Sequence, residues 1–169
     1  HYPYTLNLAI IPTDSSMGTL GFYDDPQPAF VTTNVDGSYT VMADSTFVLK
    51  ATPLTGYYLK SWSNNAMLNN MDTLHVTMTQ DSAITATFDT IVYNITYTTQ
   101  NDTRPTIGTN QSMGSVTLGG NHKHFLNDTL SVTTNYGYIF TGWYNADTLV
   151  SDTTRYVFSP KHDMSFQAR

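Results

Sequence analysis

The sequence contains one short pattern twice, a Gly-Tyr pair followed by four residues and a Trp. The first copy is GYYLKSW, Gly56–Trp62, and the second is GYIFTGW, Gly137–Trp143. Together they contain both tryptophans of the chain. An internal repeat restricts the fold strongly, because two copies of one pattern predict two copies of one supersecondary unit.

Other segments occur in the same order in both halves of the chain. SMGTL matches SMGSV, DSTFVLKATPLTGYYLKSW matches NDTLSVTTNYGYIFTGW with small gaps, and LHVTMTQDSAITA matches YVFSPKHDMSFQA. In this alignment Thr134 and Tyr136 stand where the first copy has Ala51 and Pro53. The order predicts two repeat units, residues 2–89 and 92–169, with an insertion near 22–40 in the first.

Both copies have the residue pattern of β-strands. The chain has no Glu and is rich in Thr and Tyr, which suit a pleated, half-buried surface. Apolar and polar residues alternate at the start of each copy, through Tyr4, Leu6, Leu8 and Ile10 in the first and Tyr93, Ile95 and Tyr97 in the second. The sequence therefore predicts a mainly β fold with little or no helix. Between each Trp and the last strand, either a single helical turn or a loop with a short strand would fit.

The copies differ in their loops. The insertion contains VDGSY, residues 35–39, which indicates a hairpin because Asp-Gly readily takes the positive backbone angles of a tight turn. The second copy has a longer loop after its first strand, TTQNDTRPTIGTNQS. Insertions of this kind are expected at the surface.

Charge and composition exclude several classes of partner. The net charge of -6 argues against nucleic acid and anionic membrane surfaces, which attract clustered Lys and Arg. No Cys is present, which excludes a disulfide framework and a thiolate nucleophile. No apolar stretch approaches the length of a membrane span, so we expect no direct membrane insertion by this segment. A start at His1 rather than Met is typical of a mature protein or an excised fragment.

The ordered series of motifs resembles the divergent internalin-type B-repeats, or Listeria–Bacteroides repeats, of bacterial surface proteins. The first copy matches the family pattern at Gly18-Thr19-Leu20, Leu49, Ala51, Pro53, Gly56-Tyr57, Leu59, Trp62 and Ile84–Phe88. The second matches at Gly114, Val116, Gly137-Tyr138, Phe140, Gly142-Trp143 and Ala168. The second copy stops one residue before the counterpart of Phe88.

The resemblance implies two tandem small β-grasp-like units in an exported protein, located outside the cell, at the cell surface or associated with the outer membrane. Repeats of this family serve as spacer or adhesion modules and are associated with no catalytic residues and no cofactor. We therefore expect a non-enzymatic structural module that is monomeric. The alternative is an adhesin module that binds glycans or host and surface proteins through exposed aromatic side chains.

A second resemblance concerns Asp-Ser and Asp-Thr pairs followed by a small or aliphatic residue, which are similar to the O-glycosylation acceptor motif of the Bacteroidetes. They begin at Asp44, Asp72, Asp81, Asp89, Asp128, Asp147 and Asp152. The simpler interpretation is that Asp ends a turn and Thr begins a strand. We favour turn chemistry.

Few residues suggest a reactive site. The chain lacks a Gly-x-Ser-x-Gly elbow, a phosphate loop and a His-Glu-x-x-His zinc helix. His122 and His124 would share one face of a strand and could bind a metal ion, but no third ligand is apparent, so a polar hairpin edge is favoured. Pairs of Asp could serve a glycosidase only if they converged in a cleft.

The most specific functional hypothesis concerns the aromatic residues of the Gly-Tyr segments. In a regular strand Trp62 and Trp143 lie opposite the Tyr and Leu or Phe of the motif. They would then be partly exposed and, together with Tyr58 and Tyr144, could form a binding platform. A bulge near Ser61 or Gly142 would instead turn each Trp into the core. We favour the buried alternative, because each small unit has few other large apolar groups.

Overall fold

The computed structural model describes residues 2–24, 26–63, 71–102 and 111–169. The chain divides into two compact units, unit 1 (1–90) and unit 2 (91–169). Every regular element in the described residues is a β-strand, which confirms the mainly β prediction with little or no helix. No helix with the length and hydropathy of a membrane span occurs in this part of the chain.

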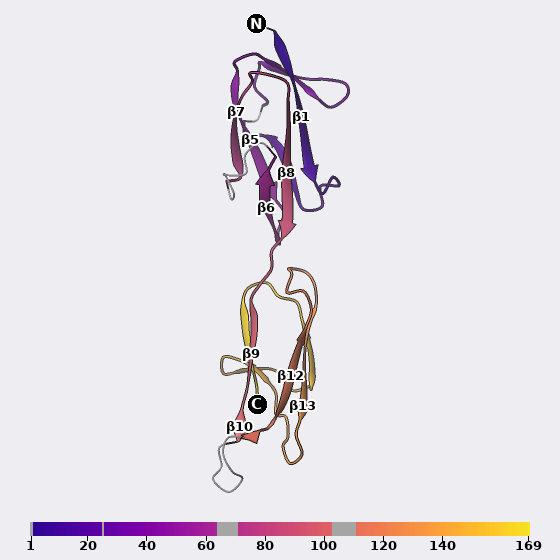
Figure 1. Cartoon of the computed structure of the whole chain (residues 1–169), viewed down its shortest axis with the longest axis vertical. Helices are drawn as coiled ribbons and strands as arrows, with labels where there is room; N and C mark the ends of the chain where they lie inside the picture. Colours follow the sequence, from indigo (N-terminus) through magenta and orange to yellow (C-terminus); the bar gives the residue numbers. More distant parts are fainter. Residues whose placement is uncertain (1, 25, 64–70, 103–110) are drawn as a thin grey trace. The chain divides into compact units, whose positions relative to one another are not determined.

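Unit 1 is built from strands that form two sheets. The strands are β1 (Pro3–Ile11), β2 (Gly18–Phe22), β3 (Val31–Thr33), β4 (Tyr39–Met42), β5 (Thr46–Pro53), β6 (Tyr57–Trp62), β7 (Thr73–Thr77) and β8 (Ser82–Thr90). The larger sheet has the order β3–β4–β1–β8–β6, and the smaller has the order β2–β5–β7. Their buried faces share one core, so the unit is a two-layer sandwich (Figure 1).

The core of unit 1 follows the alternation in the sequence. Along β5 and β8 every second side chain is buried, because alternate residues of a strand point to opposite faces. Burial of each large apolar side chain contributes about 1.5–3 kcal/mol to stability. The fully enclosed members are Leu6, Val41, Leu49, Ala51, Met78 and Ala86.

The insertion predicted in the first copy forms the β3–β4 hairpin, which confirms the VDGSY signal. The Asn34 N–H donates to the Ser38 carbonyl at 2.8 Å and closes the turn. The Asp36 carboxylate accepts from both the backbone N–H and the hydroxyl of Ser38, at 3.0 and 2.6 Å. These two bonds lower the pKa of Asp36 below its usual value of 3.8. β4 then pairs antiparallel with the start of β1.

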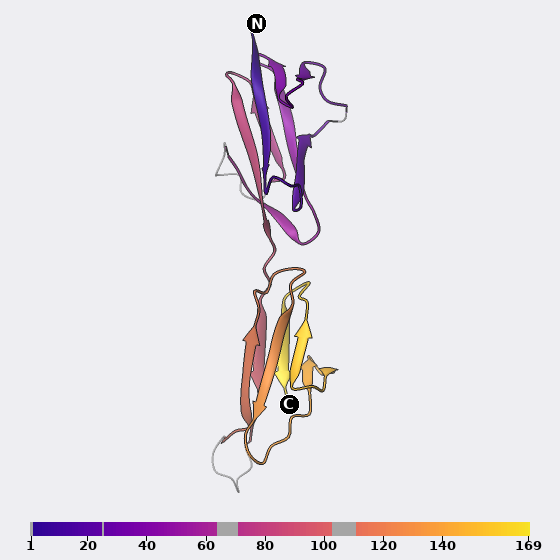
Figure 2. The ribbon, with the colours of Figure 1, turned by 90° about the vertical axis from the view of Figure 1, so that its right-hand side faces the viewer.

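Unit 2 repeats this plan with different edges. Its strands are β9 (Ile95–Thr99), β10 (Asn101–Asp102), β11 (Gln111–Ser112), β12 (Gly114–Gly119), β13 (Asp128–Thr134), β14 (Trp143–Asn145), β15 (Thr148–Ser151), β16 (Arg155–Phe158) and β17 (Met164–Ala168). One sheet has the order β15–β14–β17–β9, another has the order β12–β13–β16, and β10 and β11 form a small ribbon (Figure 2). Strands β9, β12, β13, β14, β16 and β17 correspond to β1, β2, β5, β6, β7 and β8.

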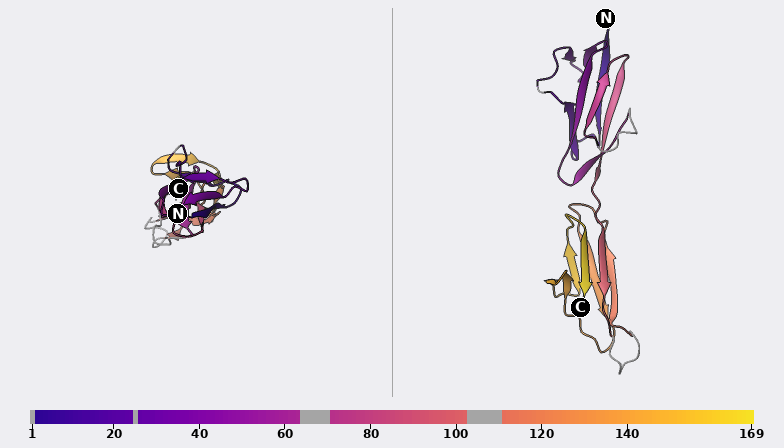
Figure 3. Two further views of the ribbon diagram at one scale, coloured as in Figure 1. Left: turned by 90° about the horizontal axis from the view of Figure 1, so that it is seen from above. Right: turned by 90° about the vertical axis from the view of Figure 1, so that its left-hand side faces the viewer.

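The first and last strands of each unit are parallel neighbours. Leu6–Ile11 of β1 are in register with Ser82–Thr87 of β8, and all of β9 is in register with β17 (Figure 3). One carboxylate joins these strands in each unit: Asp81 accepts from the Thr5 N–H at 2.7 Å, and Asp163 accepts from the Asn94 N–H at 2.8 Å. The repeat is therefore the same at the level of individual hydrogen bonds.

The core of unit 2 is smaller than that of unit 1, and aromatic rings make up a larger share of it. Phe166 of β17 contacts Phe158 of β16 with ring centroids 4.9 Å apart, and Tyr156 stacks on Phe158 at 5.5 Å. Trp143 is completely buried beside them in the same cluster. Stacked and edge-to-face pairs of this kind contribute about 0.5–1.5 kcal/mol beyond their burial.

Two details of the sequence alignment are wrong. Gly18 pairs with Pro53 and Gly114 pairs with Thr134, so Thr134 occupies the position of Pro53, not that of Ala51. The same register places Val132 at the position of Ala51, and Tyr136 lies in the following turn. The sequence alignment places its gap within the strand before the Gly-Tyr pair, whereas differences in chain length between repeats are accommodated in loops.

The predicted buried face of the first strand in unit 2 is only partly correct. Ile95 is buried, but Tyr97 is 41% exposed. β9 is an edge strand among the described residues, and a long side chain on an edge is covered from one side only. In unit 1 the corresponding strand is half-buried through Leu8 and Ile10. Residues 64–70 and 103–110, where the sequence allowed a helical turn and a long loop, lie outside the described residues.

Candidate functional site

Trp62, the first candidate for a binding platform, lies in the core of unit 1. It is 2% exposed, and its indole N–H donates to the Met71 carbonyl at 3.0 Å. The pairing of β6 with β8 shifts in register between Leu59 and Ser61. This bulge places both Leu59 and Trp62 on the buried face. In a regular strand, side chains three positions apart would point to opposite faces. The buried alternative is confirmed for Trp62.

Trp143 of unit 2 is also buried through a bulge. It is 0% exposed and donates to the Thr153 carbonyl at 3.0 Å. The N–H groups of Thr141 and Gly142 both donate to the carbonyl of Arg169, which is the signature of a bulge. Gly142 has a φ of 150°, and a Cβ there would lie 2.3 Å from the Leu149 side chain, so only Gly fits.

The strand predicted through the second Gly-Tyr segment is absent before Trp143. In unit 1 Tyr57–Trp62 form β6, whereas in unit 2 the described strand β14 begins at Trp143. Ile139 is 87% exposed, while Tyr58 at the same place in unit 1 is 39% exposed. Tyr57–Leu59 of β6 pair with Phe88–Thr90 of β8, whereas Ile139 and Phe140 belong to no described strand.

Tyr58 and Tyr144 are accessible but do not form one repeated surface. Tyr58 lies in β6 beside Lys60, whose amino group contacts Asp89 at 2.7 Å; this bond raises the pKa of Lys60. Tyr144 lies in β14, after its Trp, and the guanidinium of Arg169 sits 4.3 Å from its ring centroid. The two tyrosines occupy different positions of the repeat, so the structure does not bring them together with the indoles.

The two histidines with a possible metal role point to different partners. His122 Nδ1 lies 2.7 Å from the carboxylate of Asp128, and His124 Nδ1 lies 2.7 Å from the Tyr93 hydroxyl. Asp128 is 0% exposed and also accepts from the His122 N–H at 3.2 Å. No group of three or more metal-ligating side chains occurs among the described residues. Both histidines therefore stabilise the loop before β13.

Three Asp side chains of the Asp-Thr and Asp-Ser triplets make contacts that stabilise the fold. Asp81 joins β8 to β1, and Asp128 is buried against His122. Asp147 accepts from the Arg169 guanidinium at 2.8 Å. These contacts are the local bonds that turn and strand ends require, as the simpler interpretation of the triplets predicts.

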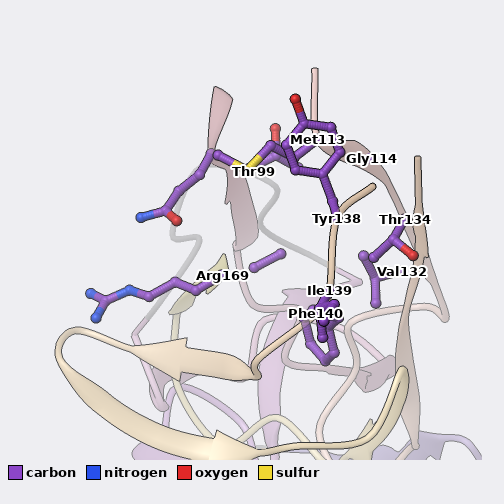
Figure 4. Close-up of a pocket in the computed structure, with 11 residues that line it drawn as sticks. Thr99, Met113, Gly114, Val132, Thr134, Tyr138, Ile139, Phe140 and Arg169 are labelled. Atoms are coloured by element: carbon purple, nitrogen blue, oxygen red, sulfur yellow. The ribbon is translucent and has the colours of Figure 1, made fainter. Parts of the chain in front are cut away.

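One pocket adjoins the Gly-Tyr segment of unit 2. It is a small, partly open pocket at the end of the sandwich. Met113, Val132, Ile139 and Phe140 give it a mainly apolar lining, with Val132 coming from β13 and Phe140 from the segment before β14 (Figure 4). Sequence reasoning did not identify it.

The fold and these sites define a class of protein, a tandem β-sandwich repeat in which the Trp of the repeated motif is buried in both units. A family model for the divergent InlB B-repeat domain matches residues 29–92 and 105–169. The chain belongs to this family of repeat modules. A comparison with curated protein sequences gives no match. Both matched regions begin after the first strand of their unit, so each structural unit includes a strand, β1 or β9, that lies before the matched residues.

Proposed function

We propose that this chain is a non-enzymatic spacer module of an exported bacterial cell-surface protein, and that each unit keeps its length under tension. The B-repeat family is associated with surface and extracellular proteins, which supports this location. The observation that carries the proposal is the parallel pairing of the first and last strands in each unit.

Parallel terminal strands place the two ends of a unit at opposite ends of the sandwich. A chain that enters along β1 leaves from the far end of β8, so the unit adds the length of a strand to whatever it connects. A strand rises about 3.3 Å per residue, which gives roughly 30 Å for a strand such as β8. A module with adjacent ends would add almost no length.

The same arrangement resists pulling. Force applied at the two ends of unit 1 drags β1 and β8 in opposite directions along their shared hydrogen bonds. All bonds between Leu6–Ile11 and Ser82–Thr87 are then loaded together instead of one after another. A shared load requires a higher force for rupture than sequential opening does.

Single-molecule force spectroscopy on the full chain tests this proposal. The chain has no Cys, so introduced cysteines provide unique handles. Tyr2→Cys with Thr90→Cys pulls the strands in shear, and Tyr2→Cys with Ser82→Cys peels them apart from one end. We expect a clearly higher unfolding force for the first pair. Equal forces in the two geometries would refute a load-bearing role.

The adhesin alternative has less support from the described residues. Both indoles are in the cores, and Tyr58 and Tyr144 occupy unrelated positions. A glycan array probed with the full chain tests it directly. Binding that is lost in Tyr58→Ala or Tyr144→Ala would establish a recognition role beside the structural one.

A further inference from the structure

We infer that the groove between β1 and β2 of unit 1 is a strand-addition site, which binds an extended peptide segment of a partner protein with alternating apolar residues and flanking basic residues. This inference concerns binding and does not depend on the proposed spacer function. It rests on the end of the β4–β1 ladder, on the main-chain groups beyond that end, and on the charge around the groove.

The groove is lined by the edges of two strands rather than by the face of a sheet. Three consecutive residues of β1, Leu8–Ile10, belong to its lining, together with Thr19 and Leu20 of β2. Consecutive residues of a strand point their side chains to opposite faces, so only a strand edge presents all of them to one space. β2 is an edge strand of its sheet, with β5 as its neighbour. The groove therefore lies between one strand edge of each sheet.

β4 covers only the first part of this edge of β1. The antiparallel pairing begins at Pro3 and ends at Leu6, which pairs with Tyr39. Leu6, inside this ladder, is 0% exposed. Leu8 and Ile10 point to the same face as Leu6 but are only half-buried against the core. A further strand in line with β4 would complete their burial.

Main-chain groups of β1 also face the groove. The Thr5 N–H donates to the Asp81 carboxylate, on the side of β8. The N–H and C=O groups of successive residues alternate between the two edges of a strand, so those of Leu8 and Ile10 are directed away from β8. Beyond the Leu6 pair they have no partner strand on this side among the described residues. β1 thus presents two donors and two acceptors to an incoming strand.

β2 presents its main chain to the groove from the other sheet. The Tyr23 N–H, directly after β2, donates to the Val48 carbonyl of β5 at 2.8 Å. By the same alternation, the N–H and C=O groups of Leu20 are directed away from β5. The Leu20 side chain packs against the core and lines the groove. An occupant would therefore lie between two strand edges.

The rim of the groove is acidic. Ser15 and Gly37 belong to the lining, and each follows an exposed aspartate, Asp14 after β1 and Asp36 in the β3–β4 turn. The hydroxyl of the serine two residues further on donates to each carboxylate and lowers its pKa, so both are anionic at neutral pH. The described lining contains no Lys or Arg. Basic residues at the ends of the occupant would complement this charge.

These features together select an extended, basic peptide. Main-chain pairing with Leu8 and Ile10 supplies affinity, and alternate side chains that enter the groove supply specificity. The entering side chains would meet Leu8, Leu20 and Tyr39, so apolar residues are favoured. A second copy of this chain is less suited as the occupant, because its net charge is -6.

Titration of the isotopically labelled full chain with a peptide, followed by the amide signals in NMR, tests the inference. The probe is the peptide Lys-Thr-Val-Thr-Val-Thr-Lys. Directly opposite residues of an antiparallel pair share one face, so the Val side chains enter the groove when the Val N–H groups face β1. One control peptide is N-methylated at both Val, which removes these donors and keeps the side chains and the charge. The other has Glu in place of both Lys.

We expect the probe to saturate at roughly 0.1–1 mM, because one added strand is a small interface. The largest shifts should be at Leu8, Ile10 and Leu20. The N-methylated peptide should not bind, and the Glu peptide should bind at least fivefold more weakly, by a rough estimate from two exposed charge pairs. No saturable shift, or shifts only outside β1 and β2, would overturn the inference. Equal binding of either control peptide would refute main-chain pairing or the role of charge, respectively.

A pair of variants tests the acidic rim. Asp14→Asn/Asp36→Asn should weaken binding of the Lys peptide roughly fivefold, because two exposed charge pairs are lost. Asp147→Asn/Asp152→Asn changes the net charge by the same amount in unit 2 and should leave the affinity unchanged. Equal losses in the two double variants would mean that the net charge of the chain, and not the groove, attracts the peptide.

Two controls accompany the titration. Each unit has one Trp, so Trp143→Phe leaves Trp62 as the reporter that unit 1 of each variant is folded. Dilution of the chain without peptide tests for a second copy as the occupant, and we expect the signals of Leu8 and Ile10 not to change. Shifts of these signals with chain concentration would show that a second copy occupies the groove and would overturn the inference as stated.

Discussion

The two units share one sandwich but differ at the end where the Gly-Tyr segment begins. In unit 1 Phe88 covers Gly18, and Tyr57–Trp62 form a strand beside it. In unit 2 the corresponding residues 138–142 lie outside any strand and border a pocket. The comparison shows that the Gly-Tyr motif does not form a strand by its own propensity. In unit 1 the motif residues Tyr57–Leu59 are paired with Phe88–Thr90 of β8.

The units also differ in how the first strand is covered. The β3–β4 hairpin of unit 1 pairs with β1 through Pro3–Leu6. In unit 2 the loop before β13 takes part of this place, through the bridge between Val92 and Lys123. The β3–β4 hairpin in unit 1 and the loop that contains His122 and His124 in unit 2 thus both cover part of the edge beside the first strand. Natural sheets protect their edges in this way.

Phe88→Ala removes from unit 1 the ring that covers Gly18 and pairs with the Gly-Tyr strand. We expect a loss of about 3–5 kcal/mol in the unfolding free energy of unit 1, as for other buried Phe to Ala changes. Urea unfolding followed by Trp62 fluorescence in Trp143→Phe measures it. Phe88→Leu should lose much less. A loss below about 1 kcal/mol for Phe88→Ala would mean that the ring is not an important part of the core.

Asp128→Ala tests the buried polar contact that distinguishes unit 2. Asp128 occupies the place of the core residue Phe47, because each lies two residues before the buried Leu of its strand. Removal of its carboxylate leaves the His122 ring and N–H without this acceptor, so we expect a loss of about 1–3 kcal/mol in unit 2.

The control for this change is Thr129→Ala, which is on the same strand and should have a smaller effect. Urea unfolding followed by Trp143 fluorescence in Trp62→Phe gives both values. A gain in stability for Asp128→Ala would show that burial of the carboxylate costs more than its hydrogen bonds return.

Gly18→Ala tests the contact between Gly18 and the Phe88 ring by a change at Gly18. The added methyl would overlap the Phe88 ring, and overpacking of this kind costs typically 1–3 kcal/mol. Leu at position 88 has no ring to overlap the added methyl, so Phe88→Leu should recover part of the loss. The double variant Gly18→Ala/Phe88→Leu should therefore lose less unfolding free energy than the sum of the two single losses. Additive losses would mean that the two residues do not interact.

The smallest effect concerns acid and the hairpin of unit 1. The pKa of Asp36 is lowered in the folded state by its bonds to Ser38. Its contribution to stability is therefore present above the unfolded-state pKa of 3.8 and is lost as pH falls through the lower folded value. Asp36→Asn should reduce the difference in thermal midpoint of unit 1 between about pH 5 and pH 2. An unchanged difference would show that Asp36 is not linked to folding.

Much of the fold could be predicted from the sequence. The repeat, the β-strand pattern and the hairpin at VDGSY depend on local residue choice, which a single sequence shows directly. The burial of Trp62 and Trp143 was one of two alternatives, because the strand period alone places them on the wrong face. The bulge that decides between them depends on a register shift against β8 or on Arg169, which is a tertiary property.

The pocket could not be predicted in the same way. It arises from the relation among Gly114, Phe140 and the line of β17, which are far apart in the sequence. Likewise, the partners of His122 and His124 lie on different segments, so their spacing alone suggested a shared face that does not exist.

Hydrogen exchange of individual amides tests most directly the central claim that each unit is the same sandwich with its Trp in the core, and that the Gly-Tyr segment is a strand in unit 1 but not in unit 2. Both indole N–H groups are bonded and buried, so we expect both to exchange slowly. The Tyr58 amide, in the paired strand β6, should also exchange slowly, while that of Ile139 should exchange rapidly. Similar slow exchange at Tyr58 and Ile139 in the full chain would contradict the account.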